Sequence, residues 1–221
     1  MIEIVLPKEL PGKRAHLLLA PEPRIKSLKE EQTPPASAKE SAVLVLLNPT
    51  YLPCGQINRN LKEWNITFIK RNTYHGVHSG QIAFPGGKCE ESDKNYTCTA
   101  CREAYEELGI EENNLSIVGP LSSLYVPPSN FTIHPILAIQ KRFNGYTPNP
   151  REVNEYLDIP LSLFDPQLAK RCRVQAGPYE WVHAPGYIID NHVIWGATAM
   201  IMCELYQVVD SLASIKFLSN P

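Results

Sequence analysis

Three carboxylates crowd a short stretch of the chain that has the pattern of a helix. Glu103, Glu106 and Glu107 are spaced at i, i+3 and i+4. At about 100° per residue, these positions fall within an arc of about 100° on one helix face. Like charges at this spacing repel each other and weaken a helix unless a cation neutralises them. A divalent ion is suited to this role, because Mg²⁺ binds carboxylate oxygens and keeps water or substrate phosphates in its other coordination positions.

The neighbours of these carboxylates favour a metal site over a solvated acidic face. Arg102 stands four residues before Glu106 and can pair with it, which would fix that side chain. Gly86 and Gly87 lie between a strand and the helix and permit backbone angles or a close approach that a side chain would block. A backbone carbonyl could therefore join the ligands of the metal. The predicted metal ligands are Glu103, Glu106, Glu107 and Gly87, with Arg102 in a structural role.

These residues belong to a longer pattern that resembles the Nudix box, usually written GX5EX7REUXEEXGU with U aliphatic. Here the pattern reads Gly87-x5-Asp93-x8-Arg102-Glu103-Ala104-x-Glu106-Glu107-x-Gly109-Ile110. Asp93 replaces the first Glu and the following gap is one residue longer, but neither departure touches the metal-ligand end. The resemblance implies a Nudix diphosphate hydrolase with Mg²⁺ or Mn²⁺ as cofactor. It also implies an α/β fold, a Nudix-like α/β/α sandwich with a mixed β-sheet.

A segment just upstream resembles the extra signature of the coenzyme A pyrophosphatase branch of that family. It comprises Lys70-Arg71-Asn72 and His78-Ser79-Gly80-Gln81-Ile82-Ala83-Phe84-Pro85-Gly86-Gly87. Asn72 stands where the signature usually has Ser, and Gly76 where it usually has a second Arg. The branch implies hydrolysis of the diphosphate bond of coenzyme A or its thioesters, giving 4′-phosphopantetheine (or its acyl form) and adenosine 3′,5′-bisphosphate. Residues 127–131 and 194–199 also resemble this branch.

Two other functions stay open at this level. One is a Nudix hydrolase that acts on another nucleoside diphosphate compound, such as ADP-ribose or NADH. This alternative stays open because Gly76 departs from the coenzyme A signature. The other is a non-catalytic nucleotide-binding module, which a degenerate box would favour. The box residues Arg102, Glu103, Glu106 and Glu107 are intact, which argues against such a module.

Substrate binding needs side chains outside the helix. Arg71, His78 and Gly86 are the candidates for contact with substrate phosphates, since an arginine can clamp two phosphate oxygens at once. The alternative is ordinary loop charge at the surface. The 3′-phosphate of coenzyme A also needs a cation, and Arg71, His78 or an unidentified lysine could supply it.

A carboxylate must take the proton of the attacking water. Glu103, Glu106 and the loop residue Glu152 are the catalytic candidates, and for Glu152 the alternative is an exposed helix turn after Pro150. We expect Trp181 and Trp195 in the core, while an aromatic residue near Tyr125 is a candidate for stacking on a base.

Strands and helices intermix along the chain, which is typical of a layered domain. The predicted strands are 41–47, 64–70, 80–84, 116–126 and 131–139, with a hairpin at 179–189. The predicted helices are 93–108, ended by Gly109, a short one at 151–156, and a closing one at 195–212. Residues 21–40 have the composition of a loop or linker. We therefore expect an N-terminal extension with a Pro-rich linker over 1–40 and a Nudix hydrolase domain over 41–221.

The composition limits the classes of protein and partner. The chain has 221 residues, 43% of them hydrophobic, and a formal net charge of −2, so we expect a small-molecule nucleotide substrate rather than nucleic acid. No apolar run reaches the roughly 18 residues of a membrane span, and the N-terminus lacks the pattern of a signal peptide. We therefore expect a cytoplasmic protein without membrane contact. The six cysteines are expected to be reduced thiols, and the sequence leaves the assembly open, a homodimer included.

Overall fold

The computed structural model describes residues 2–30, 33–72, 80–143, 145–177, 180–212 and 216–217, and its centre is an eight-stranded sheet. The strands are β2 (Lys39–Asn48), β3 (Asn65–Arg71), β4 (Ile82–Ala83), β5 (Gly86–Lys88), β6 (Leu115–Pro120), β7 (Leu124–Val126), β8 (Phe131–Gln140) and β9 (Val153–Pro160). Their order is β4-β3-β2-β8-β6, while β5 pairs with β2, β7 with β8 and β9 with β3. The sheet is mixed, because β2 and β8 are parallel and the other pairs are antiparallel.

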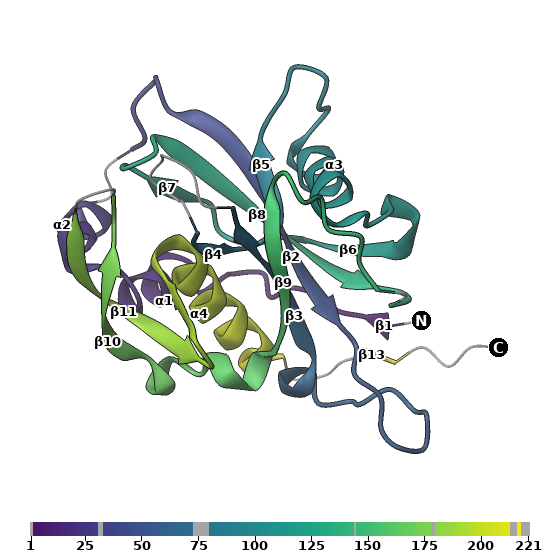
Figure 1. Ribbon diagram of the computed structural model, residues 1–221. Helices are drawn as coiled ribbons and strands as arrows, with labels where there is room; N and C mark the ends of the chain where they lie inside the picture. Colours follow the sequence, from purple (N-terminus) through teal and green to yellow (C-terminus); the bar gives the residue numbers. More distant parts are fainter. Residues whose placement is uncertain are drawn as a thin grey trace.

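Two helices cover the opposite faces of this sheet: α3 (Tyr96–Leu108) and α4 (Gly196–Ser211) (Figure 1). Side chains alternate between the two faces along a strand. In β2, Leu44 and Leu46 belong to the apolar cluster around α3, whereas Val45 and Leu47 belong to the cluster around α4. The predicted α/β/α sandwich with a mixed sheet is therefore confirmed.

A smaller antiparallel sheet leads into α4. Its strands are β10 (Lys170–Gln175), β11 (Trp181–Ile189) and β12 (His192–Trp195), in that order, and α4 begins at the residue after β12. A two-stranded sheet joins β1 (Ile2–Glu3) to β13 (Lys216–Phe217). Short 3₁₀ turns lie at Leu61–Glu63, Glu112–Asn114, Leu161–Phe164 and Pro166–Leu168. None of the described helices combines the length and the apolar character that a membrane crossing needs.

The helix that carries the carboxylates begins three residues later than the predicted Asp93. Asn95 caps it, accepting a hydrogen bond from the backbone N–H of Cys98 at 2.9 Å. Asp93 stays outside the helix and binds other partners, described below. The predicted end is confirmed, because Gly109 follows Leu108 in the left-handed conformation with φ of 71°.

Three predictions of local structure are wrong. Residues 151–156 do not form a helix, because β9 pairs with β3 along nearly its whole length. Residues 179–189 contain no hairpin turn in their described part, since β11 continues to Ile189 and the turn follows at Asp190, with φ of 51°. Residues 21–40 include the helix α2 (Glu22–Lys29), which tolerates Pro23 because a first-turn proline loses no helix hydrogen bond.

A buried carboxylate joins the N-terminal segment to α4. Glu204 is fully buried, and it accepts hydrogen bonds from the backbone N–H of Gly12 at 3.2 Å and of Ser122 at 3.2 Å. Its other oxygen lies 3.0 Å from Nε2 of His16, in α1 (Lys13–Leu18). Burial raises the pKa of Glu204, but the hydrogen bonds from His16 and Ser122 outweigh it and hold that pKa below its ordinary value.

Glu204→Gln should lower the free energy of unfolding by about 1–3 kcal/mol near neutral pH, because it removes the charge that these donors stabilise. The pKa of Glu204 is lower in the folded state, so its contribution is complete above the ordinary carboxyl pKa. That contribution is lost as the pH falls through the folded-state pKa. Urea unfolding of both proteins should therefore show a stability gap that closes below about pH 4.

The matched control is Glu63→Gln, on the exposed side of a 3₁₀ turn, which should leave stability nearly unchanged. A gap between wild type and Glu204→Gln that stays constant down to about pH 3 would contradict a charged Glu204.

Candidate active site

Glu103 lies against the backbone of Gly87, where β5 approaches α3. A Cβ atom at Gly87 would overlap all three atoms of the Glu103 carboxyl group. The carboxylate therefore occupies the space that a side chain at position 87 would take. Burial raises the pKa of Glu103, and the hydrogen bond and charge of Arg102 oppose that rise.

Glu107 is the most deeply buried carboxylate of the group, with 2% of its surface exposed. Its Oε2 accepts a hydrogen bond from the backbone N–H of Gly86 at 2.8 Å. Burial raises the pKa of Glu107 to about 8, against the opposing charge of Arg71 and the hydrogen bond from Gly86. Gly86 has φ of 152°, and a Cβ there would overlap the carbonyl oxygen of Ala42 in β2. The glycine thus lets β5 lie against β2 while its N–H faces α3.

Arg102, within α3, connects four groups, two from the helix itself and two from the segment before it. It binds the Asp93 carboxylate through Nε at 3.1 Å and Nη2 at 2.9 Å. Its Nη1 lies 2.9 Å from Glu103 Oε1 and 3.3 Å from Glu106 Oε2, and Nη2 also donates to the Lys88 carbonyl at 3.1 Å. The hydrogen bonds from Arg102 hold the pKa of Asp93 well below its ordinary value. Glu106 is the most exposed of the three helix carboxylates and contacts Arg102.

The structure brings Arg71 and Glu152 to the same carboxylates. Arg71, at the end of β3, donates from Nη2 to the Gly86 carbonyl at 2.9 Å. Glu152 precedes β9 and is held by Asn149, whose Nδ2 donates to Glu152 Oε1 at 3.1 Å. The negative charge of Glu152 raises the pKa of both Glu103 and Glu107, so it acts within the same cluster. The predicted substrate residue His78 lies outside the described residues.

These carboxylates fit a hard divalent ion that takes some of its ligands from the protein and the others from the substrate and water. In the described part of the chain, no three His, Cys, Asp or Glu side chains converge as a preformed cage. Mg²⁺ needs no such cage, since it is usually held by one or two carboxylates together with substrate phosphates and water. Glu103 and Glu107 supply two carboxylates at the glycine junction, where burial disfavours their charge unless a cation is near.

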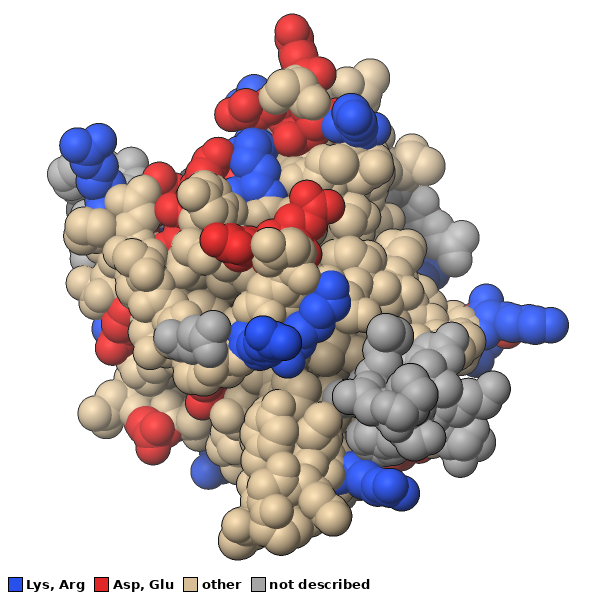
Figure 2. All heavy atoms as spheres, turned by 90° about the vertical axis from the view of Figure 1, so that its right-hand side faces the viewer, with Lys and Arg blue, Asp and Glu red and all other residues tan. Residues whose placement is uncertain are grey.

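Acidic side chains also gather on the molecular surface near this helix. In Figure 2, red acidic groups concentrate in the upper part of the face, on the side where α3 lies in Figure 1, and blue basic groups lie among them. This interleaving on the visible, described part of the face is unlike the continuous basic surface that nucleic-acid binding favours.

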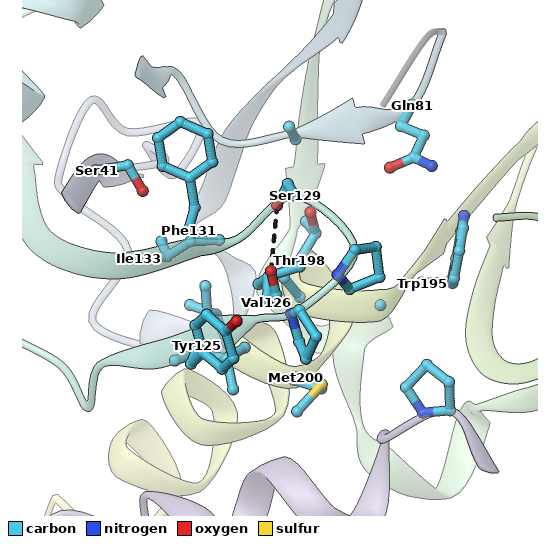
Figure 3. A pocket seen from close by; sticks show the side chains of 18 of the residues that line it. Ser41, Gln81, Tyr125, Val126, Ser129, Phe131, Ile133, Trp195, Thr198 and Met200 are labelled. Carbon is cyan, nitrogen blue, oxygen red and sulfur yellow. Dashed lines mark hydrogen bonds between the residues drawn. The ribbon is translucent and has the colours of Figure 1, made fainter. Parts of the chain in front are cut away.

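A cavity of about 900 Å³ opens beside the glycine junction (Figure 3). Arg71, Gly86, Gly87 and Lys88 line one part of it. Its other walls come from α2, from β4, from β7 and the turn after it, from β8 and β11, and from Trp195 and the first turns of α4, and they are mostly apolar. Trp195 is half-buried and lines this cavity, while Trp181 is 55% exposed, so the prediction of two core tryptophans is wrong.

Arg24, which no sequence motif singles out, lines the cavity from α2. Its guanidinium donates to the Tyr125 carbonyl and, at 3.1 Å, to Ser27 Oγ. Burial lowers the pKa of Arg24. The signal that could have found it is the proline pattern of residues 21–23, which suits the first turn of a helix as well as a linker.

Comparisons with known proteins place these features in a family. Residues 56–184 match the family model described as the NUDIX domain. The chain is 34% identical over 155 residues to Nudix hydrolase 22, chloroplastic, of Arabidopsis thaliana, covering 65% of this chain and 49% of that protein. It is 32% identical over 151 residues to the uncharacterized Nudix hydrolase NudL of Photorhabdus laumondii, covering 65% and 76%.

A third relative has a named substrate. The chain is 33% identical over 136 residues to the human mitochondrial coenzyme A diphosphatase NUDT8, covering 60% of this chain and 57% of that protein. The chain thus spans little more than half the length of the human relative and about half of the Arabidopsis one.

Gly87→Ala should separate activity from stability. The new methyl group displaces the Glu103 carboxylate, which is the far end of a flexible side chain, so the fold should tolerate the change. A shift of about 1 Å in a reacting group can reduce turnover about 10²-fold, and we expect a loss of at least that size in diphosphate hydrolysis. Thermal unfolding of the variant checks that the fold is kept.

Gly177→Ala is the control, because a Cβ there meets no described atom closer than 3.8 Å. Near wild-type turnover in Gly87→Ala would show that the position of the Glu103 carboxylate does not matter for the reaction.

Proposed function

Since the chain belongs to the Nudix family, we propose that it hydrolyses the diphosphate bond of coenzyme A or its thioesters, giving 4′-phosphopantetheine (or its acyl form) and adenosine 3′,5′-bisphosphate. The observation that carries the reaction class is the pair of carboxylates, Glu103 and Glu107, held at the Gly86–Gly87 junction beside a large cavity. The coenzyme A substrate is supported by the upstream sequence signature and by the relative named a coenzyme A diphosphatase.

We assign Glu103 and Glu107 as the carboxylates that would hold Mg²⁺ or Mn²⁺, with a backbone oxygen at Gly87 beside them. Glu106 is a third ligand or a partner that Arg102 holds in place. When bound, the ion lowers the pKa of water and neutralises charge on the diphosphate oxygens. Arg102 restrains Glu103 through Nη1, and this keeps one carboxylate oxygen in a fixed position.

Proton transfer from the attacking water is assigned to Glu152, with Glu103 as the alternative. Glu152 is exposed, and Asn149 holds its Oε1, so Oε2 can accept a proton while the carboxyl group stays oriented. Glu103 is restrained by Arg102 and pressed against Gly87, which suits a ligand better than a group that must exchange protons with water.

Arg71 and Arg24 divide the binding of substrate anions in this proposal. Arg71 donates to the Gly86 carbonyl, and its positive charge lowers the pKa of Glu107. It therefore lies close to the carboxylates, at the end of the cavity that we assign to the diphosphate. Arg24 approaches from α2, on another wall, and is the cation that we assign to the 3′-phosphate. Gly76, which replaces the second arginine of the signature, makes such a substitute necessary.

Location and assembly remain predictions. The names of two relatives place those proteins in the chloroplast and the mitochondrion, and a cytoplasmic location of this chain stays a prediction. A homodimer is compatible with the proposal and is not required by it.

Purified protein offered coenzyme A, ADP-ribose and NADH with Mg²⁺ or Mn²⁺ should release 4′-phosphopantetheine and adenosine 3′,5′-bisphosphate from coenzyme A. Mass spectrometry identifies the products. Excess EDTA should abolish the reaction, because it removes the ion that would lower the pKa of the attacking water and neutralise charge on the diphosphate oxygens.

Glu107→Gln serves as the control for contaminating activity and should reduce turnover by orders of magnitude while the fold is kept. Cleavage of ADP-ribose without cleavage of coenzyme A would replace the substrate with another nucleoside diphosphate compound. Binding of nucleotides without any cleavage would favour the non-catalytic module.

Arg24→Ala should raise KM for coenzyme A about 10-fold or more, because a charge-assisted hydrogen bond to phosphate is lost. KM for 3′-dephospho-coenzyme A should stay nearly unchanged, since that compound lacks the group that Arg24 would bind. Steady-state kinetics on the two substrates measures the ratio.

Lys26→Ala is the matched control on the same helix, since the Lys26 side chain is 85% exposed and does not line the cavity. An equal rise in KM for both substrates in Arg24→Ala would show that Arg24 does not bind the 3′-phosphate.

A further inference from the structure

Trp195 differs from the other two tryptophans in how its ring is used. Trp64 is fully buried and its indole N–H donates to the Asn58 carbonyl at 2.7 Å. The guanidinium of Arg173 lies over the Trp181 ring, 4.9 Å from the ring centre, in a cation–π contact. Among the described residues, the Trp195 ring has neither an aromatic nor a cationic partner, and its indole N–H meets no hydrogen-bond acceptor.

The Trp195 side chain is nevertheless held in place. It packs against the apolar cluster of Cys172, Val174 and Ala184 in the β10–β12 sheet. Gly186 lets β11 lie close beside it, because a Cβ at that position would come within 3.1 Å of the Trp195 Cβ. A ring fixed in this way loses little conformational freedom when a ligand binds.

The Trp195 side chain also lines the cavity. In Figure 3, Trp195 stands at the cavity wall, on the side away from Tyr125, Phe131 and Ile133. A tryptophan that is partly desolvated usually finds a partner for its N–H, and an exposed indole face stacks well on a flat ring. The wall therefore offers an apolar face and an edge donor to one flat, heteroaromatic group.

We propose that Trp195 is the platform on which the adenine base of the substrate stacks, and that it is a specificity-determining residue for adenine nucleotides. This inference rests on the proposed function, because it takes the adenine arm of a diphosphate substrate as the occupant. The flexible pantetheine arm is the competing occupant of this wall. It has no flat ring to stack, so it would gain no more from an indole than from any other apolar side chain.

Ligand quenching of tryptophan fluorescence tests the proposal without any turnover. Trp181→Phe removes the exposed tryptophan, so that Trp195 and the fully buried Trp64 are the two tryptophans that remain. In EDTA, this protein should show saturable quenching with adenosine 3′,5′-bisphosphate and none with 4′-phosphopantetheine. The same titration on Trp181→Phe/Trp195→Phe should show no quenching, which assigns the signal to Trp195.

Kinetics gives a second, independent test. Trp195→Leu keeps apolar bulk for the Cys172 cluster but loses the indole face, and KM for coenzyme A should rise about 5- to 100-fold while kcat stays within about twofold. Trp195→Phe should recover most of the affinity. Trp181→Leu, at an exposed ring, should leave both constants unchanged.

The outcomes separate this inference from the proposed function. Quenching by 4′-phosphopantetheine alone, or by neither compound, overturns the role of Trp195 even if coenzyme A is cleaved. Adenine-dependent quenching in a protein that cleaves only ADP-ribose supports the role of Trp195 and overturns the coenzyme A substrate. If Trp195→Leu fails to fold, the fluorescence titration on the Trp181→Phe protein still decides.

Discussion

The site depends on how closely α3 approaches β5. At Gly87 the Glu103 carboxylate fills the space of an absent side chain, and at Gly86 the backbone N–H binds Glu107. Gly86 also lies against β2, where any Cβ would overlap the Ala42 carbonyl. Two adjacent glycines therefore set the spacing of three elements at once. A Cβ at Gly87 would displace the Glu103 carboxylate, and a Cβ at Gly86 would push β5 away from β2 and so shift the N–H that binds Glu107.

The balance of charge at this junction explains why the carboxylates need a further cation. Arg102 binds Asp93 with two nitrogens and reaches Glu103 and Glu106 with a third, so its charge is shared among three acids. Arg71 opposes the raised pKa of Glu107 but does not cancel the effect of burial. Acidic groups thus outnumber the basic groups that contact them, which fits the divalent ion of the proposed reaction.

The features that can be predicted from the sequence are those whose neighbours are close in the chain. The helix with its stop at Gly109, the glycine pair and the carboxylates follow from short-range spacing, and the structure has them within a few residues of the predicted bounds. In residues 151–156, pairing of β9 with the distant strand β3 decides the conformation, whereas β11 runs through residues 184–186 without a turn because it pairs with its neighbours β10 and β12. The place of Glu152 could be anticipated only as a loop position, since pairing of β9 with β3 brings it to the site.

In the proposed function, bond cleavage and choice of substrate depend on different parts of the chain. The carboxylates and glycines lie inside the matched region 56–184, whereas Arg24 and Trp195, which line the cavity, lie on either side of it. Glu204 holds these outer parts together, because it binds Gly12 and His16 of the N-terminal segment from within α4. Changes in the outer segments can therefore reshape the cavity without moving the carboxylates. A relative with the same box but other residues at these two walls should cleave the same kind of bond in a different substrate.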